Sequence, residues 1–179
     1  MRGFPVLALL LTLFLPVADA AAQQAQPRKL GDYQSWTAAT LGAGGQKVCY
    51  AFTRATKVEG VPGRSANNVM LVVTHRPQGR DQVALQPGYA YPRNSNEGGD
   101  PVQVTVGSRS LGFFTAGTSA FAREGQAAVA AFPGGAQAVA RGTAPNGRGQ
   151  ASDTFSLSGF TAAYEAISKE CPARGAGRR

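Results

Sequence analysis

The sequence predicts a mainly β protein: an antiparallel β-sandwich or open barrel with one short helix and a C-terminal helix packed on it. Short strand-like segments follow one another as hairpins, and glycine and proline separate them. No segment alternates strand with helix as a parallel sheet requires. About 160 residues remain after an expected leader, which is enough for one core and too few for two.

Residues 1–20 have the pattern of a cleavable signal peptide. Arg2 supplies the positive charge, residues 4–17 form an apolar run too short to span a bilayer, and an Ala-Asp-Ala sequence follows. We expect cleavage near Ala20 and Ala21, export to the periplasm or the medium, and no transmembrane segment in the mature chain.

The rest of the chain predicts one domain between two polar ends. Residues 21–32 lack periodic apolar positions and are predicted to be a disordered leader. Residues 33–172 carry the strand and helix patterns and form the single β domain. Residues 173–179 are a basic tail with nothing to bury.

The charge is basic, with 18 Lys and Arg against 10 Asp and Glu, for a net charge of +8. Cleavage removes one positively and one negatively charged residue, so the mature chain keeps the net charge of +8. A basic surface favours anionic partners. Because the arginines are scattered singly and no motif that enters a nucleic-acid groove is present, we expect no specific nucleic-acid binding.

The first hairpin is predicted from residues 33–41 and 46–53, which flank a glycine-rich linker of hairpin length. In the second arm Tyr50 and Phe52 share one face, and Cys49 lies on the other. If the larger side chains face the core, another element has to cover Cys49.

The middle of the chain predicts four strands and a loop. Residues 68–75 carry a continuous apolar run, typical of a central strand buried on both faces, and residues 81–86 are the next strand. Residues 87–101 are rich in Gly, Pro and Asn and are predicted to be a loop. Residues 102–106 alternate cleanly and form a second hairpin with residues 110–115.

The last third predicts a short helix, a hairpin and a final helix. Residues 123–132 are alanine-rich and end at Pro-Gly-Gly, and residues 136–143 and 150–157 flank an Asn-Gly turn. Ser158 can cap a helix whose apolar residues recur at helical spacing. This stripe consists of Phe160, Ala163, Tyr164, Ile167 and Cys171.

The two cysteines, Cys49 and Cys171, are predicted to form one structural disulfide, because an exported chain meets an oxidising compartment. A redox pair would need close spacing. A metal site needs more ligands than two distant cysteines and one histidine, so we expect no metal and no cofactor. Since Cys171 ends the helical stripe, the bond would fasten the last helix over the hairpin face that bears Cys49.

Several motifs resemble those of the invasion-associated locus B family of exported bacterial proteins. They comprise a tryptophan ahead of the first cysteine, a Thr-His-Arg-Pro stretch, and a Ser-Leu-x-Gly-Phe motif that leads into a helix ending in cysteine. The matching residues are Trp36, Thr74, His75, Arg76, Pro77, Ser156, Leu157, Gly159 and Phe160. The resemblance spans nearly all of the mature chain and implies an envelope or secreted protein without a known catalytic residue, cofactor or substrate.

Catalysis would depend on His75, the sole histidine. A Ser-His-Asp arrangement requires Ser156 or Ser158 with Asp81 or Asp153, and no nucleophile-elbow sequence surrounds either serine. We therefore expect His75 to be structural or solvated, and no residue to be catalytic.

Together these patterns favour a non-enzymatic envelope or secreted binding module that contacts a host protein or an anionic envelope component. A periplasmic chaperone-like or stress-related accessory, which pairs with exposed strand edges, is the first alternative. An uncharacterised hydrolase is the second. The ligand and the oligomeric state have no signal in the sequence.

Overall fold

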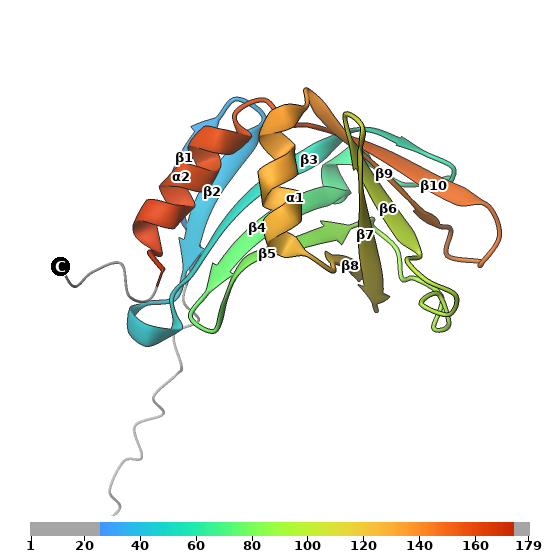
Figure 1. The fold of residues 1–179 in the computed structure, drawn as a ribbon, viewed down its shortest axis with the longest axis horizontal. Coiled ribbons are helices and arrows are strands. Elements are labelled where there is room, and N and C mark those ends of the chain that lie inside the picture. Colours follow the sequence, from blue (N-terminus) through green and yellow to red (C-terminus); the bar gives the residue numbers. More distant parts are fainter. Residues whose placement is uncertain (1–25, 174–179) are drawn as a thin grey trace, which may run out of the picture.

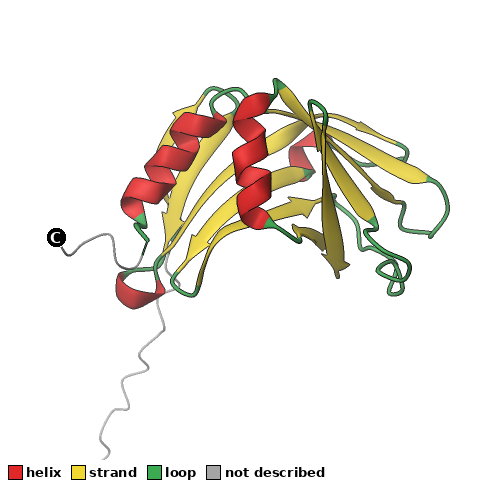
Figure 2. Cartoon of the chain, in the orientation of Figure 1, coloured by secondary structure: helices red, strands yellow, loops and turns green. Residues whose placement is uncertain are grey.

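A computed structural model describes residues 26–173, which form ten β-strands and two α-helices (Figures 1 and 2). The strands are β1 (Arg28–Tyr33), β2 (Trp36–Leu41), β3 (Val48–Glu59), β4 (Met70–Arg76), β5 (Gly79–Gln86), β6 (Val102–Val106), β7 (Arg109–Ala116), β8 (Ser119–Ala122), β9 (Gln137–Thr143) and β10 (Gln150–Ser156). The helices are α1 (Gly125–Ala131) and α2 (Phe160–Glu170), with short 3₁₀ turns η1 (Gly44–Gln46), η2 (Ala66–Asn68) and η3 (Phe132–Gly134). The expected signal peptide lies outside the described residues, as does the basic tail beyond residue 173.

The sheet closes on itself because the long strand β3 pairs with both β4 and β10. Its first half pairs with β4 and its second half with β10, and all pairings are antiparallel. Eight strands, β3 to β10, therefore form a closed barrel, and β2 and β1 extend the sheet beyond β3. The prediction of a mainly β, antiparallel fold with two helices is confirmed, and the architecture is a barrel.

Small and β-branched side chains line much of the inner face of the sheet, and large ones come both from strands and from the helices and their flanks. Along β6, for example, Val102, Val104 and Val106 are buried and alternate with more exposed residues. Both helices lie against the same side of the curved sheet (Figure 1), with α2 on β1 to β3 and α1 on β5. No helix within residues 26–173 is long and apolar enough to cross a membrane.

The expected disordered leader is wrong for residues 28–32, which form most of β1. Their backbone pairs with β2, and Leu30 and Tyr33 pack against the core. This strand has no alternating apolar pattern of its own, and tertiary pairing stabilises it. The short β8 was also not predicted.

The buried face of β3 is the one that carries Cys49. Ala51 and Thr53 share this buried face, whereas Tyr50 and Phe52 are half-buried on the outer face. A core face made by the larger side chains of β3 is therefore wrong, because other strands and the helices fill the space over its small residues. Similarly, β4 is not buried on both faces: its inner residues are buried and its outer residues, such as Met70 and Val72, are half-buried.

The cap of α2 also differs from the prediction. Gly159 occupies the N-cap position with a φ of +87°, and Ser158 makes no cap hydrogen bond to the helix. A Cβ atom on residue 159 would lie 1.9 Å from the carbonyl oxygen of Tyr33. Close approach to β1, together with a left-handed backbone, requires glycine here.

Candidate functional site

A β-bulge in β5 organises the site. Arg80 and Asp81 of β5 lie opposite the single residue His75 of β4, because the register of the two strands shifts after Thr74. Asp81 has a φ of +56°, in the left-handed region that aspartate tolerates better than most residues. A bulge re-aims side chains, and here it turns Arg80 toward α2 and the amide of Asp81 toward His75.

His75 is enclosed between β4, β5 and α2. Its side chain is 1% exposed, and its ring meets that of Tyr164 edge-on with centroids 5.3 Å apart. Nε2 lies 3.0 Å from the hydroxyl of Ser168, and Nδ1 accepts a hydrogen bond from the backbone amide of Asp81 at 3.3 Å. Burial, reinforced by the charge of Arg80, lowers the pKa of His75 to about 4, so the ring is neutral near pH 7.

These hydrogen bonds fix the tautomer of His75. Because Nδ1 accepts from Asp81, the neutral ring carries its proton on Nε2 and donates it to Ser168. A general base would need the reverse, with a free lone pair on Nε2 facing the serine hydroxyl. The carboxylate of Asp81 accepts instead from Tyr164 at 2.7 Å and lies 3.7 Å from Nδ1. Serine, histidine and aspartate thus come together with hydrogen bonds that hold α2 against the barrel.

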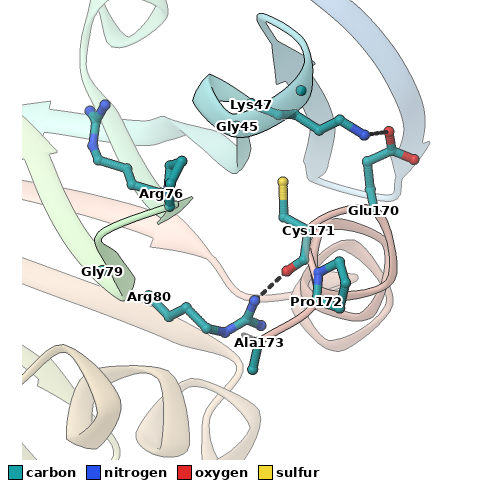
Figure 3. A pocket seen from close by; sticks show the side chains of 11 residues that line it. Gly45, Lys47, Arg76, Gly79, Arg80, Glu170, Cys171, Pro172 and Ala173 are labelled. Carbon is teal, nitrogen blue, oxygen red and sulfur yellow. Dashed lines mark hydrogen bonds and ion pairs between the residues drawn. The ribbon is translucent and has the colours of Figure 1, made fainter. Parts of the chain in front are cut away.

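A cavity of about 500 Å³ opens beside this network (Figure 3). It lies between η1, the turn from β4 to β5 and the end of α2. Its lining consists of Gly44, Gly45, Lys47, Arg76, Pro77, Gly79, Arg80, Glu170, Cys171, Pro172 and Ala173. Three of these side chains are cationic and one is a carboxylate, so the cavity carries a positive excess.

The carboxylate in the cavity is already neutralised. Lys47 and Arg28 each reach Glu170 at 2.8 Å, and the hydrogen bond from Lys47 lowers the pKa of the Glu170 carboxyl. Figure 3 shows the Lys47–Glu170 pair on one wall and Arg80 donating to the carbonyl of Cys171. The charges of Arg76 and Arg80 therefore remain unbalanced among the residues that line the cavity.

Arg76 is the most available of these cations. Its side chain is exposed, and among the described residues it makes one hydrogen bond, to the neutral amide oxygen of Gln82 at 3.0 Å. Arg80 is more constrained, because it also donates to Ser168 at 3.2 Å. Arg76 can therefore reorient toward an anion at little cost.

The predicted cysteine pair borders the cavity. The sulfur atoms of Cys49 and Cys171 lie at disulfide distance, with Cα atoms 6.0 Å apart. Cys49 also stands directly opposite His75 in the pairing of β3 with β4. The bond joins the end of α2 to the barrel on the same side as the His75 network.

The structure divides the predicted motif residues into two groups. Arg76 and Pro77 line the 500 Å³ cavity, which we call the basic cavity, and the buried residues Thr74 and His75 directly precede them in β4. The second group forms a core contact in which the indole of Trp36 donates to the carbonyl of Ser156 at 3.0 Å and packs edge-on against Phe160. Its members are Trp36, Ser156, Leu157, Gly159 and Phe160, and they position the start of α2.

The other candidates for a catalytic triad lie elsewhere. The hydroxyl of Ser156 bonds to Ser35 at 2.9 Å, and Asp153 pairs with Arg64. The serine that meets His75 is Ser168, which sequence reasoning missed. Its only signal was its position in α2, four residues after Tyr164 of the apolar stripe.

Within the described part of the chain, no group of three or more His, Cys, Asp and Glu side chains is placed to hold a metal ion. Comparisons with models of protein families, with curated proteins and with solved structures each found no match.

Proposed function

We propose that this protein is a non-enzymatic binding module that holds an anionic group, a phosphate or a carboxylate, in the basic cavity. The positive excess of the cavity carries the proposal: Arg76 and Arg80 line it, while Glu170 is balanced by Lys47 and Arg28. Oxygen anions are the complementary ligands, and the arginine fork binds them with two parallel hydrogen bonds.

The hydrogen bonding of His75 supports binding rather than hydrolysis. The proton on Nε2 faces Ser168, and Arg80 donates to the same hydroxyl oxygen. Two donors on one oxygen hold Ser168 in place and leave no base to activate it. These contacts support a structural role for His75.

The edge of the sheet argues against the alternative function, a chaperone-like accessory that pairs with exposed strand edges of other proteins. β1 is the terminal strand, and it carries Arg28, Lys29 and Asp32 together with a register irregularity. Charged side chains and bulges are features that protect a sheet edge from pairing with another chain.

Export to the bacterial envelope belongs to the same proposal. The signal-peptide pattern of residues 1–20 and the resemblance to the invasion-associated locus B family both support it. A disulfide-distance cysteine pair fits an oxidising compartment. An anionic envelope component or an acidic host surface would then be the source of the anion.

Titrations can test the proposal with three probes: inorganic phosphate, vesicles of phosphatidylglycerol and phosphatidylcholine, and vesicles of phosphatidylcholine alone. Binding of phosphate at the cavity is expected in NMR spectra of the disulfide-bonded protein. Binding to anionic vesicles only would identify a lipid headgroup as the source. Either interaction is expected to weaken steeply as salt is added, because exposed charges are screened.

The variant Arg76→Gln should weaken binding several-fold. Arg148→Gln is the matched control, since it removes the same charge from an exposed residue that does not line the cavity. Equal loss in both variants would reduce the interaction to net charge and contradict a site. Binding unchanged in Arg76→Gln would contradict the role of the cavity.

A further inference from the structure

A second cavity, of about 480 Å³, lies where the barrel wall opens between β5 and β8. These two strands pair only through Ala84 with Phe121 and Leu85 with Ala120. Nearby, the start of α1 packs on β5 so closely that a Cβ on Gly125 would lie 1.8 Å from the carbonyl oxygen of Asp81. The lining residues are Arg80, Asp81, Gln82, Val83, Phe114, Phe121, Ala122, Arg123, Gly125 and Gln126.

Two stacked aromatic rings form the apolar surface of this cavity. Phe114 and Phe121 have centroids 5.7 Å apart and planes inclined by 29°. Phe114 is 37% exposed and, with Leu41, is one of two exposed large hydrophobic residues in the range 26–173. Exposed aromatic surface inside a concave site is typical of a place where a ligand packs.

Cationic side chains flank these rings. The guanidinium carbon of Arg123 lies 5.8 Å from the centroid of the Phe114 ring, and Arg80 lines the same cavity. The one carboxylate in the lining, Asp81, is occupied by the hydroxyl of Tyr164. Arg123 also pairs with Asp100, which lies outside this lining and competes with any anion for the guanidinium.

We propose that this cavity binds a small aromatic carboxylate, with its ring against Phe114 and Phe121 and its carboxylate on Arg123. The stacked rings select a flat apolar body, and the cationic flank selects a negative charge. The volume falls within the range of small-molecule sites. Because the basic cavity contains neither Phe114 nor Arg123, the two sites can be tested separately.

The probe is 3-phenylpropionate, titrated into the whole disulfide-bonded protein and followed by NMR. Shifts are expected at residues of the β5 to β8 cavity. The neutral analogue 3-phenylpropanol should bind more weakly because it lacks the carboxylate. Cyclohexylpropionate should also bind more weakly, because its ring cannot stack on Phe114 and Phe121. No shift at these residues up to the solubility limit of the probe would overturn the proposal, and equal binding of the alcohol would overturn the anionic part of it.

Substitutions that change affinity in opposite directions make the test sharper. Arg123→Gln should weaken binding about two- to fivefold, and Asp100→Asn should strengthen it, because it frees the guanidinium. Phe114→Ala should weaken binding about tenfold, and Phe114→Leu serves the same purpose if the alanine variant fails to fold. Leu41→Ala is the control for loss of exposed apolar surface. Weakening by Asp100→Asn, or an equal effect of Leu41→Ala, would contradict the assigned site.

Discussion

The guanidinium of Arg64 and the carboxylate of Asp153 meet at 2.7 Å, with 4% and 3% of their side chains exposed. Arg64 also donates to the backbone carbonyls of Glu59 and Pro87 and lies over the ring of Tyr89. One side chain therefore ties the loop after β3 to β10 and to the segment after β5.

Removing one partner of this pair should be costly. Arg64→Met or Asp153→Ala alone is expected to lower the free energy of unfolding by about 3–5 kcal/mol, because each leaves a buried charge uncompensated. The double variant should lose less than the sum of the two. Urea unfolding followed by circular dichroism measures all three.

The exposed pair of Lys57 and Glu59 provides the control, with side chains 64% and 52% exposed. Lys57→Ala should change stability by less than about 1 kcal/mol. Strict additivity at Arg64 and Asp153 would show that the two side chains do not interact energetically.

Acid should destabilise the protein through His75. The histidine of the unfolded chain takes up a proton near pH 6.5, whereas the folded protein does so near pH 4, so the unfolded state holds more protons between these values. This group is expected to contribute up to about 3 kcal/mol at pH 7, which is lost as the pH falls from 6.5 to 4.

The variant His75→Gln separates this effect from titration of the carboxylates. It should be less stable at pH 7 and show a shallower loss between pH 6.5 and 4, as measured by urea unfolding at each pH. Parallel pH profiles for the two proteins would mean that His75 does not carry the dependence.

Reduction of the Cys49–Cys171 bond should lower thermal stability. The two residues are 122 positions apart, so the chain-entropy argument gives at most about 5 kcal/mol, or roughly 10–20 °C in Tm. Calorimetry with and without reductant measures the shift. The Cys49→Ala, Cys171→Ala double variant should be insensitive to reductant, and identical Tm values for the oxidised and reduced wild type would contradict a stabilising bond.

Gly159→Ala should destabilise α2. The substitution combines a left-handed backbone with a Cβ 1.9 Å from the carbonyl of Tyr33, and we expect a loss of at least about 3 kcal/mol. Gly44→Ala is the matched control, since Gly44 has a φ of +55° and an added Cβ would have nothing within 4 Å, and it should lose about 1 kcal/mol. Similar losses in urea unfolding would assign the effect to the backbone alone.

Local patterns predicted the elements that carry their own signal. The alternation at residues 102–106, the Asn-Gly turn before β10 and the helical stripe ending in Cys171 each match the structure. Trp36 and Phe160 lie in one aromatic contact, although they are far apart in the sequence.

Features that depend on tertiary pairing could not be predicted in this way. β1 is stabilised by β2 and α2, and nothing in its own residues marks it as a strand. The bulge at Asp81 exists only in the register of two strands, so neither the position of Arg80 nor the partnership of His75 with Ser168 had a local signal. The face of β3 that forms the core depended on large side chains that other strands and the helices supply, such as Trp36 and Phe160.

Closure of the barrel between β3 and β10 gives the chain a high contact order. During synthesis the hairpin of β3 and β4 can form early, because its contacts are local, whereas the partner of the second half of β3 is made almost last. A nascent chain therefore carries an unpaired strand edge until β10 has emerged, and a free Cys49 thiol until Cys171 has followed. The speed with which the final residues dock sets how long both are open to aggregation and to incorrect disulfides.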